Sequence, residues 1–203
     1  MTQNSAIDRL VALTFPYRHD PVAMAQVEAV ARYAYKRYET CWHESGHAVS
    51  AVVLGAQIRS VVVPDDEGLT DPSGLTSIEP DSFPAGRKAA IAYAGPWAQA
   101  RWIAGRRPTL RQLYSVMQHH TPATDGAVLC ASGGTAAGSD VVPLMERCWP
   151  AVAKVASKLL IESRASHEDV CSALGLSRHS RGIELAMIRS GSSPGSFRVT
   201  APR

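Results

Sequence analysis

The sequence contains no apolar run that approaches the roughly 18 residues of a membrane-spanning helix, so we expect no membrane span. Lysine and arginine nowhere form a run longer than two residues and the net charge is only +3, so nucleic-acid binding is not expected. The N-terminus lacks a basic region followed by an apolar one, so we expect no secretory signal. The four cysteines have no paired spacing, which indicates reduced thiols rather than disulfides. Together these absences predict a cytoplasmic globular protein.

The length of 203 residues suits one domain with its own hydrophobic core. Most of the apolar residues recur with helical spacing, and short β-branched runs predict a few strands. The expected fold class is therefore α+β, mainly α-helical with a small β-sheet. We expect a loosely ordered segment over 1–19, a single domain over 20–189, and a disordered tail over 190–203 that is rich in glycine, serine and proline.

Residues 43–47, His43-Glu44-Ser45-Gly46-His47, have the pattern H-E-x-x-H, which is a general signature of zinc metallopeptidases. In a helix, two histidines four residues apart lie about 40° apart around the axis, so both imidazoles can hold one metal ion. Glu44 then lies beside the ion, where a general base belongs. The sequence therefore predicts a Zn²⁺ site with His43 and His47 as ligands and Glu44 as the catalytic residue.

Asp20-Pro21 predicts the start of a helix, with aspartate as the N-cap and proline in the first turn. Because one helix from there to the end of the motif would be unusually long, we expect a break near Glu39-Thr40. Thr40 would cap a second helix, which carries the motif and ends at Gly55.

Strands are predicted at 58–63 and 75–78, where β-branched residues lie between turn signals. A helix is predicted over 85–104, and Gly95-Pro96 is expected to kink it or divide it in two. Residues 121–139 are rich in threonine, alanine, glycine and serine, which predicts a flexible loop that leads into Asp140 at the start of the next helix.

A catalytic zinc ion needs a third protein ligand from elsewhere in the chain. The residues after His47 lack the H-x-x-G-x-x-H continuation of the metzincins, so that class is excluded. Glu146 and Glu162 lie on later predicted helices, and Asp140 follows the glycine-rich segment. The residues alone leave these three candidates open.

The segment Tyr38–Ala56, YETCWHESGHAVSAVVLGA, resembles the start of the FtsH-type peptidase domain, the proteolytic half of the membrane-anchored AAA+ proteases. The resemblance covers about residues 38–175 through the order of later segments, which are 61–64, 74–76, 93–101, 138–140 and 166–174. It implies a zincin-like FtsH peptidase architecture, with Asp140 in the place of that family's aspartate zinc ligand.

The sequence contains no Walker A motif, so the resemblance implies a peptidase domain that stands alone without the ATPase module. Such a domain would be a zinc metalloendopeptidase that hydrolyses flexible or unfolded polypeptides. An extended substrate would pair with the strand at Gly74-Leu75-Thr76. A separate ATP-dependent unfoldase and a homo-oligomer stay open as partners. Candidates for oxyanion stabilisation are His119, His120 and Tyr93.

Two other functions fit the motif. One is a non-catalytic zinc-binding module that uses the site for protein interaction, and the other is a different metal hydrolase on a similar scaffold. The intact Glu44 argues against the first, because a purely structural zinc site has no use for a general base.

Overall fold

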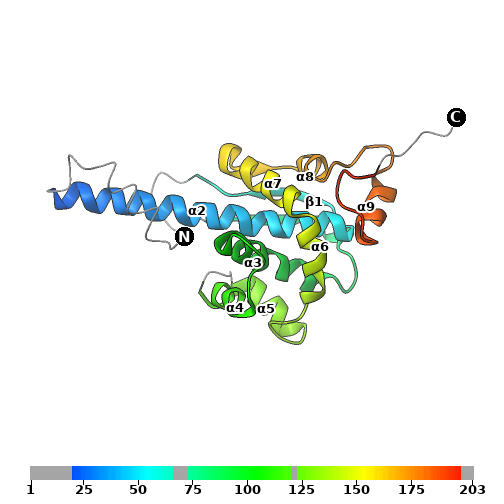
Figure 1. Cartoon of the computed structure of the whole chain (residues 1–203), viewed down its shortest axis with the longest axis horizontal. Coiled ribbons are helices and arrows are strands. Elements are labelled where there is room, and N and C mark those ends of the chain that lie inside the picture. The colour runs from blue at the N-terminus through cyan, green and yellow to red at the C-terminus, as the bar shows by residue number, and fades with distance from the viewer. Residues whose placement is uncertain (1–19, 66–72, 120–122, 198–203) are drawn as a thin grey trace.

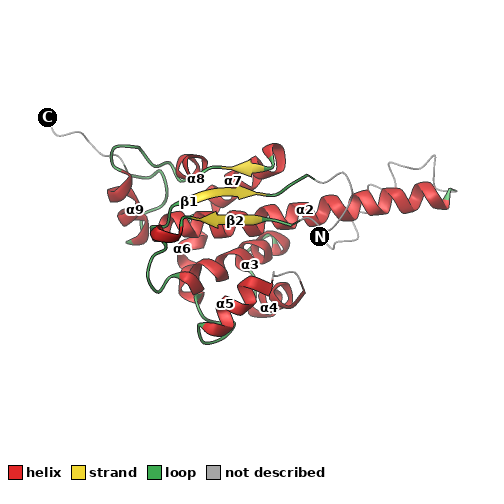
Figure 2. Cartoon of the chain, turned by 180° about the vertical axis from the view of Figure 1, so that it is seen from behind, coloured by secondary structure: helices red, strands yellow, loops and turns green. Residues whose placement is uncertain are grey.

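Helices make up most of the structure, and a small antiparallel sheet lies along one side of them (Figures 1 and 2). This confirms the predicted α+β class. The computed structural model describes residues 20–65, 73–119 and 123–197. The predicted loose segment 1–19 lies outside these residues. Within them, no helix combines the length and the apolar character that crossing a bilayer requires.

The longest element is α2, a helix of 34 residues from Pro21 to Leu54. It begins as predicted, because the Asp20 carboxylate accepts hydrogen bonds from two backbone N–H groups of the first turn. It also ends as predicted, at Gly55, whose φ of 106° lies in the left-handed region that favours glycine. The N-terminal end of α2 extends beyond the other described elements, whereas its C-terminal half is surrounded by them (Figure 1).

The predicted break at Glu39-Thr40 is wrong, because α2 continues through both residues. The Thr40 hydroxyl donates a hydrogen bond to the carbonyl oxygen of Lys36, one turn earlier, at 3.0 Å. A threonine that bonds back along its own helix does not cap a new one. The H-E-x-x-H motif therefore lies within a long helix, whose position is fixed by contacts along its whole C-terminal half.

Two groups of helices lie on opposite sides of α2 in Figure 1, with α3, α4 and α5 on one side and α7 and α8 on the other. Their bounds are α3 Lys88–Ala104, α4 Leu110–His119, α5 Ala123–Ala131, α6 Val142–Arg147, α7 Trp149–Glu162, α8 His167–Ala173 and α9 Arg181–Arg189. Short 3₁₀ turns, η2 (Pro80–Ser82) and η3 (Ser139–Val141), precede α3 and α6. The helices α2 and α3 form the central pair.

Of the two outcomes predicted for Gly95-Pro96, division of the helix is wrong, because α3 runs through both residues. The expected loop over 121–139 contains the helix α5. Of the tail predicted to be disordered, residues 190–197 are described and Phe197 packs against the core, while 198–203 lie outside the described residues.

The sheet has three strands in the order β2-β1-β3, with both pairs antiparallel. The first two strands, β1 (Ile58–Val62) and β2 (Leu75–Ile78), lie where the sequence predicts them. The third strand, β3 (Arg164–Ala165), has only two residues and is too short to be predicted from a pattern of residue types in the sequence. Within the described residues β2 is an edge strand, so one side of it is free of strand partners.

Glycines bring α2 and α3 unusually close together. A Cβ atom on Gly46 of α2 would overlap the carbonyl oxygen of Ala94 and lie 2.7 Å from the Cβ atom of Ala98. A Cβ atom on Gly95 of α3 would overlap the imidazole of His47. Both glycines are therefore required by the close approach of the two helices beside the motif.

Candidate metal centre

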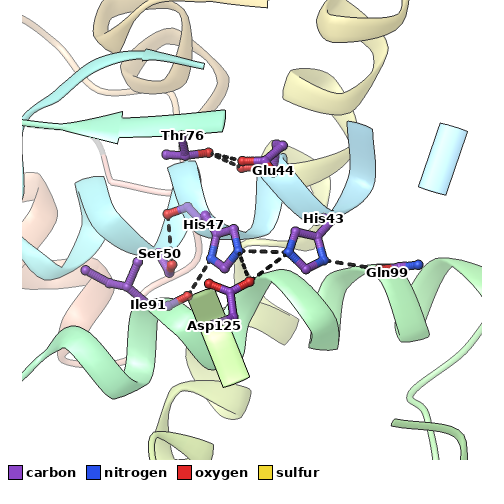
Figure 3. Close-up of polar contacts among 8 residues, drawn as sticks. All are labelled: His43, Glu44, His47, Ser50, Thr76, Ile91, Gln99 and Asp125. Atoms are coloured by element: carbon purple, nitrogen blue, oxygen red, sulfur yellow. Dashed lines mark hydrogen bonds and ion pairs between the residues drawn. The ribbon is translucent and has the colours of Figure 1, made fainter. Parts of the chain in front are cut away.

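Three side chains from two elements converge at one point beside α2 (Figure 3). The Nε2 atoms of His43 and His47 lie 3.0 Å apart. Asp125, from α5, places its Oδ2 atom 3.0 Å from Nε2 of His43 and 3.1 Å from Nε2 of His47. The histidines are buried, and the Asp125 side chain is only 16% exposed.

The outer nitrogen of each histidine contacts an oxygen atom. Nδ1 of His43 lies 3.1 Å from the side-chain oxygen of Gln99, and Nδ1 of His47 lies 2.8 Å from the carbonyl oxygen of Ile91 (Figure 3). Each oxygen can only accept a hydrogen bond, so both Nδ1 atoms carry the proton. In the neutral imidazoles both Nε2 atoms then present lone pairs toward Asp125.

Three acceptor atoms at this distance repel one another unless positive charge lies among them. A proton is one source of that charge. Burial alone lowers the pKa of His47, but the hydrogen bond and the charge of Asp125 outweigh it and raise the pKa to about 9. Burial raises the pKa of Asp125, and its hydrogen bonds to His43 and His47 bring it well below the ordinary value. A divalent cation is the other source, and it can take the place of that proton.

The donor set fits zinc in both chemistry and size. Two imidazole nitrogens and one carboxylate oxygen are ligands that Zn²⁺ commonly takes in catalytic sites. Bonds of about 2.0–2.1 Å in a tetrahedron separate neighbouring ligand atoms by about 3.3 Å. The observed separations of 3.0, 3.0 and 3.1 Å form a nearly equilateral triangle only slightly smaller than that.

Glu44 faces the sheet and is held there by β2. The Thr76 hydroxyl donates to Oε2 of Glu44 at 2.7 Å (Figure 3). Gly74 makes this approach possible, because a Cβ atom at that position would overlap the Glu44 side chain. The segment Gly74-Leu75-Thr76, predicted to bind substrate, therefore lies directly against the predicted base.

A cleft of about 330 Å³ opens over the centre. Glu44, His47 and Asp125 line it together with β2, so the predicted base and two of the three converging side chains share one cavity. The outer strand residue Leu75 is 66% exposed, which leaves the edge of the sheet accessible beside the cleft.

The structure assigns the third position of the centre to Asp125 and not to Asp140. The Asp140 side chain is 69% exposed, and its carboxylate lies 3.6 Å from Arg87. The alternatives lie elsewhere too, because Glu146 pairs with Arg101 and Glu162 pairs with Lys158. The resemblance-based choice of Asp140 is therefore corrected to Asp125.

Asp125 is not among the predicted ligands, because the composition of 121–139 predicts a loop there. A helix-start signal was present in Thr121-Pro122, which repeats the pattern of Asp20-Pro21 and stands directly before α5.

Of the candidate oxyanion groups, Tyr93 is buried in the core and His119 is the last residue of α4. His120 lies outside the described residues.

A comparison of the sequence with protein-family models finds no match, and a comparison with curated proteins finds no significant match.

Proposed function

We propose that the chain is a zinc-dependent metalloendopeptidase with a zincin-like, FtsH-type peptidase fold that acts without an ATPase module of its own. His43, His47 and Asp125 would hold the metal, and Glu44 would be the catalytic base. The observation that carries the proposal is the convergence of three zinc-type donor atoms at 3.0–3.1 Å from one another, two of which belong to residues that line the same cleft as the buried Glu44. The resemblance of residues 38–56 to the FtsH-type peptidases supports it.

Zn²⁺ bound at this centre would supply Lewis acidity, which polarises a carbonyl oxygen and makes a water molecule more acidic. Glu44 would accept a proton from the attacking water and deliver it to the leaving amine. Thr76 holds the Glu44 carboxylate by its Oε2 atom, so the base has a fixed position before substrate arrives. Gln99 and Ile91 fix the histidine rings through their Nδ1 atoms.

The edge strand β2 supports an endopeptidase in particular. An extended polypeptide can pair with the free edge of a sheet through its backbone, whatever its side chains are. Because β2 contacts Glu44 through Thr76, a peptide on that edge would pass along the cleft. Folded proteins keep most of their extended segments paired within their own sheets, so flexible or unfolded polypeptides are the proposed substrates, delivered by themselves or by a separate unfoldase.

Hydrolysis of casein, an unstructured protein, tests the proposal directly. Glu44→Gln should lower the rate by at least about 100-fold, since general-base catalysis contributes roughly that much or more. Zinc content, measured by elemental analysis, should stay at the wild-type level. Glu28→Gln is the matched control, because Glu28 lies exposed on the same helix, far along it from the centre.

Two results would contradict the proposal. If the Glu44→Gln chain cleaves casein at the wild-type rate, Glu44 is not the base. If the wild-type chain binds zinc but shows no casein cleavage that a chelator inhibits, the non-catalytic zinc-binding module is the better description.

A further inference from the structure

The cleft over the candidate metal centre is lined by acidic side chains and by a lysine. Glu44 and Asp125 supply two carboxylates, and Lys88, the first residue of α3, is the basic residue of the lining. The Lys88 ammonium lies 5.4 Å from the centroid of the Phe83 ring. In the described part of the chain no carboxylate pairs with it. Lys88 is exposed to solvent, so a ligand bound in the cleft can reach its ammonium group.

The position of Lys88 is set by the same helix that orients His47. Lys88, Ile91 and Ala92 lie on one face of α3, because residues three and four apart are neighbours on a helix. The carbonyl oxygen of Ile91 accepts the hydrogen bond from His47 (Figure 3). Lys88 therefore lies three residues, about 4.5 Å along the axis, from the Ile91 backbone that contacts His47.

The neighbouring cation, Arg87, does not share this position. It is absent from the lining of the cleft and lies 3.6 Å from the carboxylate of Asp140. Of these two adjacent basic residues, only Lys88 lines the cleft, whereas Arg87 is paired with Asp140 outside it.

Apolar side chains form part of the wall of the same cleft. They are Ile78, Phe83, Ile91 and Val128. A ligand that fills this part of the cleft would place an apolar side chain against the wall and its next charged group near the ammonium. A carboxylate suits that position, because it would give Lys88 the partner that it lacks.

We propose that Lys88 selects substrates that carry a carboxylate next to an apolar residue. That carboxylate is either the side chain of aspartate or glutamate or the free C-terminal carboxylate of a peptide. The proposal rests on the proposed function in that it assigns the cleft to peptides, and it names Lys88 as a specificity-determining residue of that cleft.

The test is peptide binding to the Glu44→Gln chain, which removes turnover from the measurement. Fluorescein-labelled peptides with a single leucine in a glycine–serine background form two matched pairs. In one pair the leucine is followed by aspartate or asparagine with an amidated C-terminus, and in the other the C-terminus after the leucine is free or amidated. Anisotropy titrations at low ionic strength, with zinc and with a chelator, give the affinity ratio of each pair.

The carboxylate member of at least one pair should bind about two- to five-fold more tightly, the range of a solvent-exposed ion pair. Lys88→Gln should equalise the pair and Lys88→Glu should reverse it. Arg87→Gln should leave the ratio unchanged. The pair that responds distinguishes a side-chain carboxylate from a C-terminal one. The asparagine peptide of the first pair and the amidated peptide of the second pair should bind all variants alike.

A preference that survives Lys88→Gln would overturn the proposal, because the carboxylate would then be bound by the metal or elsewhere. Equal loss in Arg87→Gln would also overturn it, since the effect would then come from general surface charge. The absence of any binding would do the same. Casein cleavage by the chain with Glu44 intact tests the proposed function separately, so failure of one proposal is distinguishable from failure of the other.

Discussion

Both histidines of the candidate centre are held by a contact on the side away from the converging atoms. His47 donates from Nδ1 to a backbone carbonyl, and His43 contacts the Gln99 side chain. Glu44 is held by Thr76 from the neighbouring strand. These contacts restrict ring and carboxylate rotation, so the centre is ordered before a metal or a substrate arrives.

At this scale the sharpest prediction concerns the two aspartates. Asp125→Asn should weaken zinc binding by at least about 100-fold, because it removes the charge of a proposed ligand. Loss of a group that only hydrogen-bonds a ligand already weakens metal binding by up to about that factor. Asp140→Asn should leave the affinity unchanged, since Asp140 pairs with Arg87 on the surface. Competition with a chromophoric chelator measures both. The opposite order of effects would return the third ligand to Asp140.

At the scale of elements, the centre depends on how closely α2 and α3 pack. Gly46 and Gly95 allow the two helices to approach, and the second of these lies directly against the His47 ring. The packing thus places the ring where the Ile91 carbonyl can accept a hydrogen bond from its Nδ1 atom. Helix α5 contributes Asp125, and a Cβ atom added at its Gly126 would meet no atom within 4 Å outside the neighbouring backbone.

A pair of glycine substitutions tests this packing. Gly95→Ala should lower the free energy of unfolding by about 1–3 kcal/mol, because overpacking forces the helices apart, and should also weaken zinc binding. Gly126→Ala is the control, since alanine in an open helical position should be neutral or stabilise by up to about 1 kcal/mol. Urea unfolding monitored by circular dichroism gives both values. Equal effects of the two changes would show that the α2–α3 contact does not govern the centre.

At the scale of the whole molecule, the centre joins parts of the chain that are far apart in sequence. Asp125 lies 82 residues after His43 and 78 after His47. The hydrophobic core, by contrast, is formed by buried apolar residues that do not include the centre. A metal bound there would link α5 to α2 and stabilise a fold that the core already maintains.

Metal removal should therefore weaken the fold without unfolding it. Free zinc at about 100 times its dissociation constant should add about 2.7 kcal/mol to the free energy of unfolding, and a chelator should remove that increment. The circular dichroism spectrum of the chelated chain should stay helical. The Asp125→Asn chain should show no zinc-dependent increment. A midpoint of urea unfolding that does not respond to zinc in the wild type would rule out this linkage.

Local signals in the sequence predicted much of the fold and part of the site. Asp20-Pro21 and Gly55 set the ends of α2 through short-range hydrogen bonds and backbone preference, which act whatever the rest of the chain does. The strands at 58–62 and 75–78 followed from β-branched residues between turns. The spacing of His43 and His47 predicted that the two imidazoles would share one side of a helix, as they do.

Only the tertiary structure decided what completes the site. Local signals place both Asp125 and Asp140 near a helix start, but they do not indicate which of the two reaches the histidines. The packing of α5 against α3 brings Asp125 to the histidines, and the helix turn at Ser139 turns Asp140 toward Arg87. The sequence by itself determined a two-histidine helix with an adjacent glutamate. The third side chain depends on contacts between elements some 80 residues apart, and local sequence carries no record of such contacts.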